Sequence, residues 1–180
     1  MINKIVIKNQ QELDLIPEHC DILITIDFGT ESAPAIIKSN HKYVVWDKKV
    51  EIRSNCTLKA YGSSIVIANK LCKVFAYENS LVYAYDFSRV YMHNNSHAIA
   101  CDNSTVFCCD SSSSEGYDNC LLVGKDKAQL LGKNKTVCLI DNFCSAESDD
   151  ESFVVAKGNT QVIKSSKASS VQLFENARVF

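Results

Sequence analysis

Nine cysteines and four histidines are the residues of this sequence that could bind a metal ion or act as nucleophiles. His93 precedes Cys101 by eight residues and Cys109 by sixteen, a spacing at which residues stack in a repetitive β-structure. Zinc sites normally recruit three or four protein ligands, whereas one stacked column supplies only His93 and Cys109. We therefore expect no metal site and no cofactor.

Acidic and amide residues recur every eight positions through the middle of the chain. They are Glu78, Asp86, Asn94, Asp102, Asp110, Asp118, Asp126, Asn134, Asn142 and Asp150. Residues of these types tolerate the left-handed backbone of tight corners, so one interpretation is turn chemistry. The other interpretation is a line of negative charge that imitates a phosphate backbone, helped by the absence of Lys and Arg between Val90 and Gly124. Both interpretations assign this acidic column to the corners of the fold.

The constellations that support catalysis are missing from the sequence. A nucleophile with a base, a phosphate-binding glycine loop and paired carboxylates are the patterns that indicate an active site. Glu115 and Glu147 are predicted to lie on one outer sheet, but two coils apart. We expect a protein that is not an enzyme.

The recurrence comes from an octad repeat that begins at Val50, as in VFAYENSL (74–81) and VYAYDFSR (82–89). The first position is usually Val or Leu, and the third and seventh positions are small in most octads. These three positions are spaced by two, so they share the inward face of an extended strand. The octad predicts an all-β fold, a single-stranded parallel β-solenoid in which a five-residue strand alternates with a three-residue corner.

Two or three octads could make one coil. Small first-position residues recur at multiples of sixteen, whereas the intervening octads keep large ones, which favours two strands and sixteen residues per coil. The small residues are Ala98, Ser114 and Ala146, and the large ones are Val106, Leu122 and Val154. A flat coil with one small and one large wall conserves the volume of its core.

Most cysteines occupy inward positions of the octad, where cysteine behaves as a small hydrophobic residue. They are Cys56, Cys72, Cys108, Cys120, Cys138 and Cys144. Only Cys101 and Cys109 take a position that leans outward.

The first 49 residues lack the octad and are predicted to form a cap continuous with the rod. They contain a strand-like segment at 4–8, a helix-compatible segment at 10–16, a second strand-like segment at 21–27, and His41–Trp46 leading into the repeats. We expect two parts, a cap over residues 1–49 and the solenoid over residues 50–180.

The charge balance excludes generic binding to nucleic acids or anionic membranes. The formal net charge is −2 and the isoelectric point is about 6.1, whereas such binding requires a basic excess. No apolar run approaches the roughly 20 residues that span a bilayer. We expect a soluble protein of a bacterial cytoplasm, without direct nucleic-acid or membrane binding.

Outward positions of one sheet become apolar in the C-terminal half. In a two-sided coil this sheet carries Phe107, Leu121, Val123, Val137, Leu139, Phe153 and Val155. An exposed apolar patch usually marks an interface, and a symmetric homodimer is the simplest one. A three-sided coil would scatter these residues, and a folded-over cap would cover them.

The segments AYGSSIVIA (60–68) and AYENSLVYA (76–84) resemble the octad repeats of hypothetical proteins from phages and gut bacteria. The segment ELDLIP (12–17) is similar to the cap that precedes such arrays. The resemblance implies the fold and leaves function open, because fold does not fix function.

The function predicted here is protein binding without catalysis. The rod is expected to be a phage or mobile-element inhibitor that docks on a host defence protein, as a nucleic-acid mimic or a steric block. The alternative is a structural spacer or adhesive element of a virion or cell surface. The apolar patch and the segregated charges favour specific recognition over a monotonous spacer.

Overall fold

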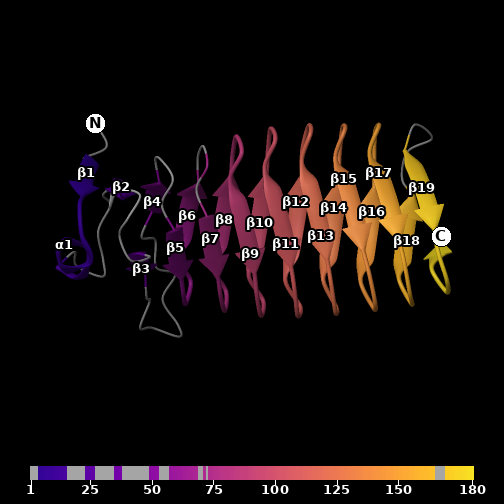
Figure 1. Cartoon of the computed structure of the whole chain (residues 1–180), viewed down its shortest axis with the longest axis horizontal. Coiled ribbons are helices and arrows are strands. Elements are labelled where there is room, and N and C mark those ends of the chain that lie inside the picture. The colour runs from indigo at the N-terminus through magenta and orange to yellow at the C-terminus, as the bar shows by residue number, and fades with distance from the viewer. Residues whose placement is uncertain are drawn as a thin grey trace.

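The computed structural model describes residues 4–15, 23–26, 35–37, 49–52, 57–68, 71, 73–164 and 169–180. Two sheets, each built of parallel strands, face each other along a rod of about seven turns (Figure 1). Sheet A contains β1 (Lys4–Ile7), β2 (Leu23–Ile26), β4 (Lys49–Ile52), β6 (Ile65–Ala68), β8 (Leu81–Ala84), β10 (His97–Ala100), β12 (Ser113–Gly116), β14 (Gln129–Gly132), β16 (Ser145–Ser148), β18 (Gln161–Lys164) and β20 (Arg178–Val179). Sheet B contains β3 (Ala35–Ile37), β5 (Thr57–Ala60), β7 (Lys73–Ala76), β9 (Arg89–Met92), β11 (Thr105–Cys108), β13 (Leu121–Gly124), β15 (Val137–Ile140), β17 (Phe153–Ala156) and β19 (Ser170–Leu173).

The coil has two strands and about 16 residues, as the small and large walls predicted. From β4 to β18 each strand pairs with the strand sixteen residues away, for example His97 with Ser113 and Thr105 with Leu121. The register lengthens to seventeen residues between β17 and β19, where Phe153 pairs with Ser170. The pairing of β18 with β16 keeps the sixteen-residue register, so the additional residue falls between Lys164 and Ser170.

The strands from β4 to β19 are four residues long, one fewer than the octad predicted. The seventh position is buried, but it belongs to the corner because its side chain closes the turn. The Ser80 and Ser96 hydroxyls donate to the carbonyls of Tyr77 and His93, over 2.8 Å and 2.7 Å. These bonds satisfy polar groups that burial would otherwise penalise.

The core consists of inward residues from the two facing sheets. Val82, Val90 and Val106 at the first position are fully buried, and Ala84 and Ala100 at the third position pack beside them. The small residues Ala98, Ser114 and Ala146 lie on sheet A, and the large residues Val106, Leu122 and Val154 lie on sheet B. Unequal walls therefore fill the thin core at these coils. Elsewhere sheet A carries large residues at the first position, namely Val66, Val82, Leu130 and Val162, and sheet B carries the small Cys138 in the coil of Leu130.

The N-terminal region continues the rod. β1 and β2 pair in parallel and belong to sheet A, and helix α1 (Gln10–Asp14) lies at that end beside β1 (Figure 1). Asn9 caps the helix, because its Oδ1 accepts from the Glu12 N–H over 2.9 Å. Glu12 in turn accepts from the Lys8 N–H over 2.7 Å and from Asn9 Nδ2 over 2.8 Å. The strand, helix and strand predicted for residues 4–27 are confirmed with shorter bounds, and His41–Trp46 falls outside the described residues.

Glycines at the third position provide a test of core packing. A Cβ on Gly116 would lie 2.7 Å from Thr136 Cγ2 and 3.0 Å from Leu122 Cδ1, whereas one on Gly124 would meet its nearest atom at 3.2 Å. We expect Gly116→Ala to destabilise the rod by about 1–3 kcal/mol through overpacking. Gly124→Ala should change stability by less than about 1 kcal/mol, because a milder contact is offset by lower unfolded-chain entropy. Urea unfolding of both variants checks the order, and equal losses would contradict this packing.

Candidate protein interface

The seven apolar residues predicted as an interface lie together on sheet B. We call this set the apolar face: Phe107, Leu121, Val123, Val137, Leu139, Phe153 and Val155. They project from four consecutive strands, β11, β13, β15 and β17. Leu121 pairs in register with Val137 and then Phe153, and Val123 pairs with Leu139 and then Val155. The sixteen-residue register therefore turns residues that are distant in sequence into one contiguous surface.

The apolar face is open to solvent. Leu139 and Phe153 are each 37% exposed, and the other five residues are partly exposed. From β7 to β19 no outward position of sheet B is acidic, and the charged residues at these positions are Lys73 on β7 and Arg89 on β9. Sheet B therefore offers an apolar half and a cationic half.

Aromatic rings extend the apolar face toward the N-terminus. Phe75, Tyr91 and Phe107 stack on consecutive strands, with ring centroids 4.9 Å apart at both steps. Lys73 Nζ lies 4.8 Å from the Phe75 centroid and 5.1 Å from that of Tyr91. Because the rings cover one another, their edges point outward, which suits packing against a partner better than stacking on nucleic-acid bases.

Sequence reasoning missed this ladder, although the sixteen-residue spacing of aromatics at the second position carried the signal. It also missed Leu71 and Phe87, which are each 60% exposed. Both lie in corners that precede strands of sheet B, so they border the cationic half.

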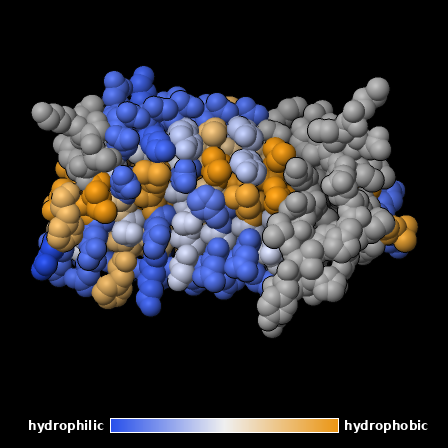
Figure 2. Space-filling model, turned by 180° about the vertical axis from the view of Figure 1, so that it is seen from behind, coloured by the Kyte–Doolittle hydropathy of each residue, from blue (hydrophilic) through white to orange (hydrophobic). Residues whose placement is uncertain are grey.

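The outer surface of sheet A has a different character, because polar residues interrupt its apolar ones. Figure 2 shows such an alternation of apolar and polar surface along the rod. A shallow hollow of about 320 Å³ lies over β10 to β18, lined by His97, Ser113, Glu115, Leu131 and Glu147 among others. Glu115 and Glu147 stand two coils apart on β12 and β16, as predicted.

Polar contacts in the hollow hold its side chains in place. Tyr117 Oη donates to Glu115 over 2.9 Å and accepts from Lys133 Nζ over 3.3 Å. His97 Nδ1 lies 2.8 Å from Ser113 Oγ, a pair that sequence reasoning missed. The strand N–H groups around this pair bond to neighbouring strands, so they are not available as an oxyanion hole.

The acidic column divides between two edges of the rod, because successive corners lie on opposite sides of a two-sided coil. We call edge 1 the corners that follow sheet B strands, and edge 2 the corners that follow sheet A strands. Edge 1 carries Glu78, Asn94, Asp110, Asp126 and Asn142, and edge 2 carries Asp86, Asp102, Asp118, Asn134 and Asp150. All ten residues have positive φ, between 52° and 66°, so turn chemistry accounts for their types.

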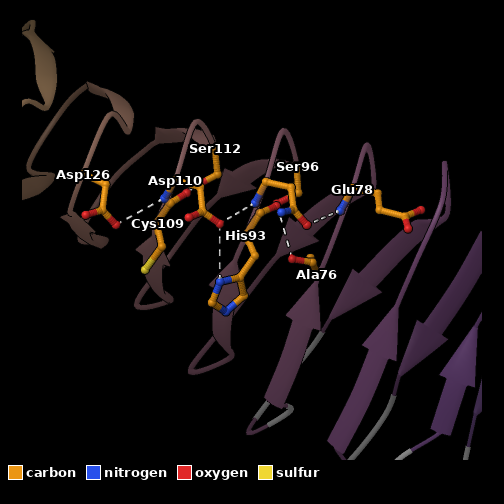
Figure 3. A network of polar contacts seen from close by, with 9 residues as sticks. Ala76, Glu78, His93, Ser96, Cys109, Asp110, Ser112 and Asp126 are labelled. Carbon is orange, nitrogen blue, oxygen red and sulfur yellow. Dashed lines mark hydrogen bonds and ion pairs between the residues drawn. The ribbon is translucent and has the colours of Figure 1, made fainter.

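Side chains of the acidic column also join successive coils. Asp110 Oδ2 accepts from the Asn94 N–H over 2.9 Å, and Asn94 Oδ1 accepts from the Glu78 N–H over 3.2 Å (Figure 3). The Glu78 carboxylate accepts from the Gly62 N–H over 2.8 Å. Each such residue therefore shapes its own corner and ties it to the coil before.

Edge 1 brings His93, Cys109 and Asp110 close together (Figure 3). His93 Nδ1 lies 3.8 Å from Asp110 Oδ2, and the imidazole stacks on Tyr77 with centroids 5.1 Å apart. Cys101 lies on edge 2, so it does not join this group. Within the described residues, no group of three His, Cys, Asp or Glu side chains could hold a metal ion.

Burial makes the cysteine thiols poor nucleophiles. It raises the pKa of Cys108 and of Cys138 to about 12, and that of Cys144 to about 11. The pKa values of Cys101 and Cys109 are also raised, first by partial burial and then by neighbouring charges, which include Asp102 for Cys101 and Asp126 for Cys109. Because the thiolate is the reactive form, these thiols act as packing groups at neutral pH.

Comparisons of the chain with models of protein families, curated proteins and solved structures give no match. Across the described residues, no helix is long and apolar enough to cross a membrane. The apolar face of sheet B is thus the surface from which a function can be argued.

The corner ladder predicts how Asp110 tolerates substitution. Asp110→Ala places a poorly suited residue in left-handed backbone and removes the acceptor of the Asn94 N–H, so we expect a loss of about 1–2 kcal/mol in unfolding free energy. Asp110→Asn keeps a carbonyl acceptor and a residue that tolerates this backbone, so it should lose less than about half of that. Urea unfolding measures both variants, and an Asn variant as unstable as the Ala variant would contradict the assigned role.

Proposed function

We propose that this chain is a protein-binding module without catalytic function, and that it associates with a second copy through the apolar face of sheet B. The observation that carries the proposal is the gathering of seven apolar side chains on four consecutive strands. Exposed apolar surface is stabilised by burial, at about 25 cal/mol for each Å² removed from water. A flat sheet suits this role because two sheets pack face to face about 10 Å apart.

The available area supports a dimer. Seven strands from β7 to β19, at ~4.8 Å each and roughly 20 Å wide, present on the order of 700 Å² per copy. A standard interface buries about 800 Å² per partner, with an apolar centre and a polar rim. The apolar face supplies the centre, and the charged corners on both sides supply the rim.

We also retain inhibition of a host defence protein as the narrower function, which the resemblance to phage octad arrays supports. The corner carboxylates in this role would imitate the charge of nucleic acid, in addition to their bonds within the corner ladder. A gene neighbourhood of defence or anti-defence genes would support this function. A neighbourhood of tail or capsid genes would instead support the structural spacer.

The proposed self-association is tested by replacing apolar residues with Asp. We expect the chain to sediment as a dimer, and Leu139→Asp or Phe153→Asp to shift it to monomer by burying a charge without a partner. Ile163→Asp is the matched control, because Ile163 is 53% exposed on the outer surface of sheet A. Sedimentation equilibrium over a range of concentrations gives the mass of each variant. A chain that is monomeric throughout, or a control that dissociates equally, would overturn the proposal.

A further inference from the structure

The corners that border the apolar face alternate in charge along the rod and across it. At β15, Lys135 lies on edge 2 and Asp141 lies on edge 1. At β17 the signs are exchanged, with Glu151 on edge 2 and Lys157 on edge 1. At β15 and β17 the two edges therefore carry opposite charges, and the pattern reverses between these two coils. At β11 both edges are acidic, with Asp102 on edge 2 and Asp110 on edge 1.

These four residues lie at the ends of the corners that adjoin sheet B strands. Asp141 and Lys157 come directly after the last residues of β15 and β17, and Lys135 and Glu151 precede those strands by two residues. Lys135, Glu151 and Lys157 are exposed, and Asp141 is half-buried. Asp141 Oδ1 accepts from the Asn142 N–H over 2.8 Å, which holds its carboxylate at the corner.

Two copies can pair through sheet B about a two-fold axis in two simple ways. An axis parallel to the rod keeps the copies parallel and places edge 1 of one copy over edge 2 of the other at the same level. An axis parallel to the strands makes the rods antiparallel and places each edge over the same edge of the partner. The charges distinguish these arrangements.

The parallel arrangement matches charge at both levels. Lys135 faces the second copy's Asp141, and Glu151 faces the second copy's Lys157, each pair occurring twice. Lys157 Nζ also lies 3.4 Å from Glu175 Oε1 of its own chain, so the Lys135–Asp141 pair is the one that depends on the second copy. The apolar face also covers itself, since Leu121 faces Val123, Val137 faces Leu139 and Phe153 faces Val155.

The antiparallel arrangement centred on the apolar face also opposes unlike charges, since it sets Lys135 over the corner of Asp118 and Lys157 over that of Asp110. It differs in its like-charge contact, because it places the corner of Asp149, Asp150 and Glu151 over the corner that contains Asp102. The like-charge contact of the parallel arrangement, Asp102 over Asp110, has only one carboxylate on each side.

We propose that two copies pair in parallel about a two-fold axis along the rod, with Lys135 and Asp141 forming ion pairs between copies. This inference rests on the proposed self-association through the apolar face and specifies its geometry. Alternating charge then sets the register, because sliding one copy by a coil places like charges opposite each other.

The geometry is tested by exchanging the charges of Lys135 and Asp141. These residues are six positions apart along an extended strand, roughly 20 Å, which exceeds the screening length of about 8 Å at physiological salt. Coupling between them must therefore arise between copies. We expect Lys135→Glu and Asp141→Lys each to raise the dimer dissociation constant by roughly tenfold, and the double variant to return within about threefold of the starting chain.

Repulsion within one chain cannot imitate this rescue. Glu151 neighbours residue 135 and Lys157 neighbours residue 141 on adjacent coils, and both neighbours are the same in the single and double variants. Lys127→Glu is the matched control, because Lys127 is an exposed edge 1 lysine two residues before β14 of sheet A. Lys127→Glu should leave the dimer dissociation constant within about twofold of that of the starting chain.

Sedimentation equilibrium of all four variants separates the outcomes. Rescue in the double variant supports the parallel geometry. Additive weakening overturns it, because an antiparallel pair would set each reversed charge against a like charge. Single variants whose dissociation constant is unchanged also overturn the parallel geometry. If Leu139→Asp still dissociates the dimer in that case, the proposed self-association stands. A chain that is monomeric at every concentration overturns both the parallel geometry and the self-association.

Discussion

Hydrogen bonding between successive coils is the constraint on which the rest of this structure depends. In a parallel ladder every strand N–H and C=O bonds to a neighbouring strand, so each coil must match the length of the next. This requirement fixes the sixteen-residue register and makes the chain turn at each corner within a few residues. Left-handed backbone allows such a tight corner. The residues of the acidic column adopt this backbone, and side chains of the column also bond to the preceding coil. The corner residues are therefore part of the ladder as well as a charged surface.

A rod held by its backbone leaves its outward side chains free to specialise. Inward positions are restricted to residues that fill a thin core. The buried cysteines are small enough to meet this restriction: Cys108, Cys120 and Cys144 take places usually held by alanine or serine, and Cys138 takes one usually held by valine or leucine. Outward positions carry no such restriction, yet the two sheets differ in a consistent way. Sheet A alternates apolar and polar residues, whereas sheet B gathers apolar ones without a carboxylate from β7 to β19. A difference that the ladder does not require is the kind of feature that recognition explains.

The octad predicted much of the fold because its period is geometric. It identified inward and outward positions, and the sizes of Ala98 and Val106 indicated two strands per coil. The same period gathered the seven residues of the apolar face on one sheet. The octad could not predict contacts that depend on side-chain conformation. These include the stack of Phe75, Tyr91 and Phe107 and the 2.8 Å contact of His97 Nδ1 with Ser113 Oγ. The strand length was wrong by one residue, because an octad does not reveal that the seventh side chain closes the corner.

The sixteen-residue coil, rather than the octad alone, places the apolar face on one sheet. Deleting one coil, residues 129–144, leaves every remaining strand on its own sheet, whereas deleting one octad, residues 129–136, moves all later strands to the opposite sheet. The first deletion removes Val137 and Leu139, together with Lys135 and Asp141, but it brings Leu121 and Val123 beside Phe153 and Val155, so the remaining five residues of the apolar face stay contiguous on sheet B. The second deletion divides the face between the two sheets, although both chains retain octads that can stack. Sedimentation equilibrium of the two deletions is the most direct test. A dimer for the coil deletion and a folded monomer for the octad deletion are predicted, and equal dimerisation of both chains would contradict the account.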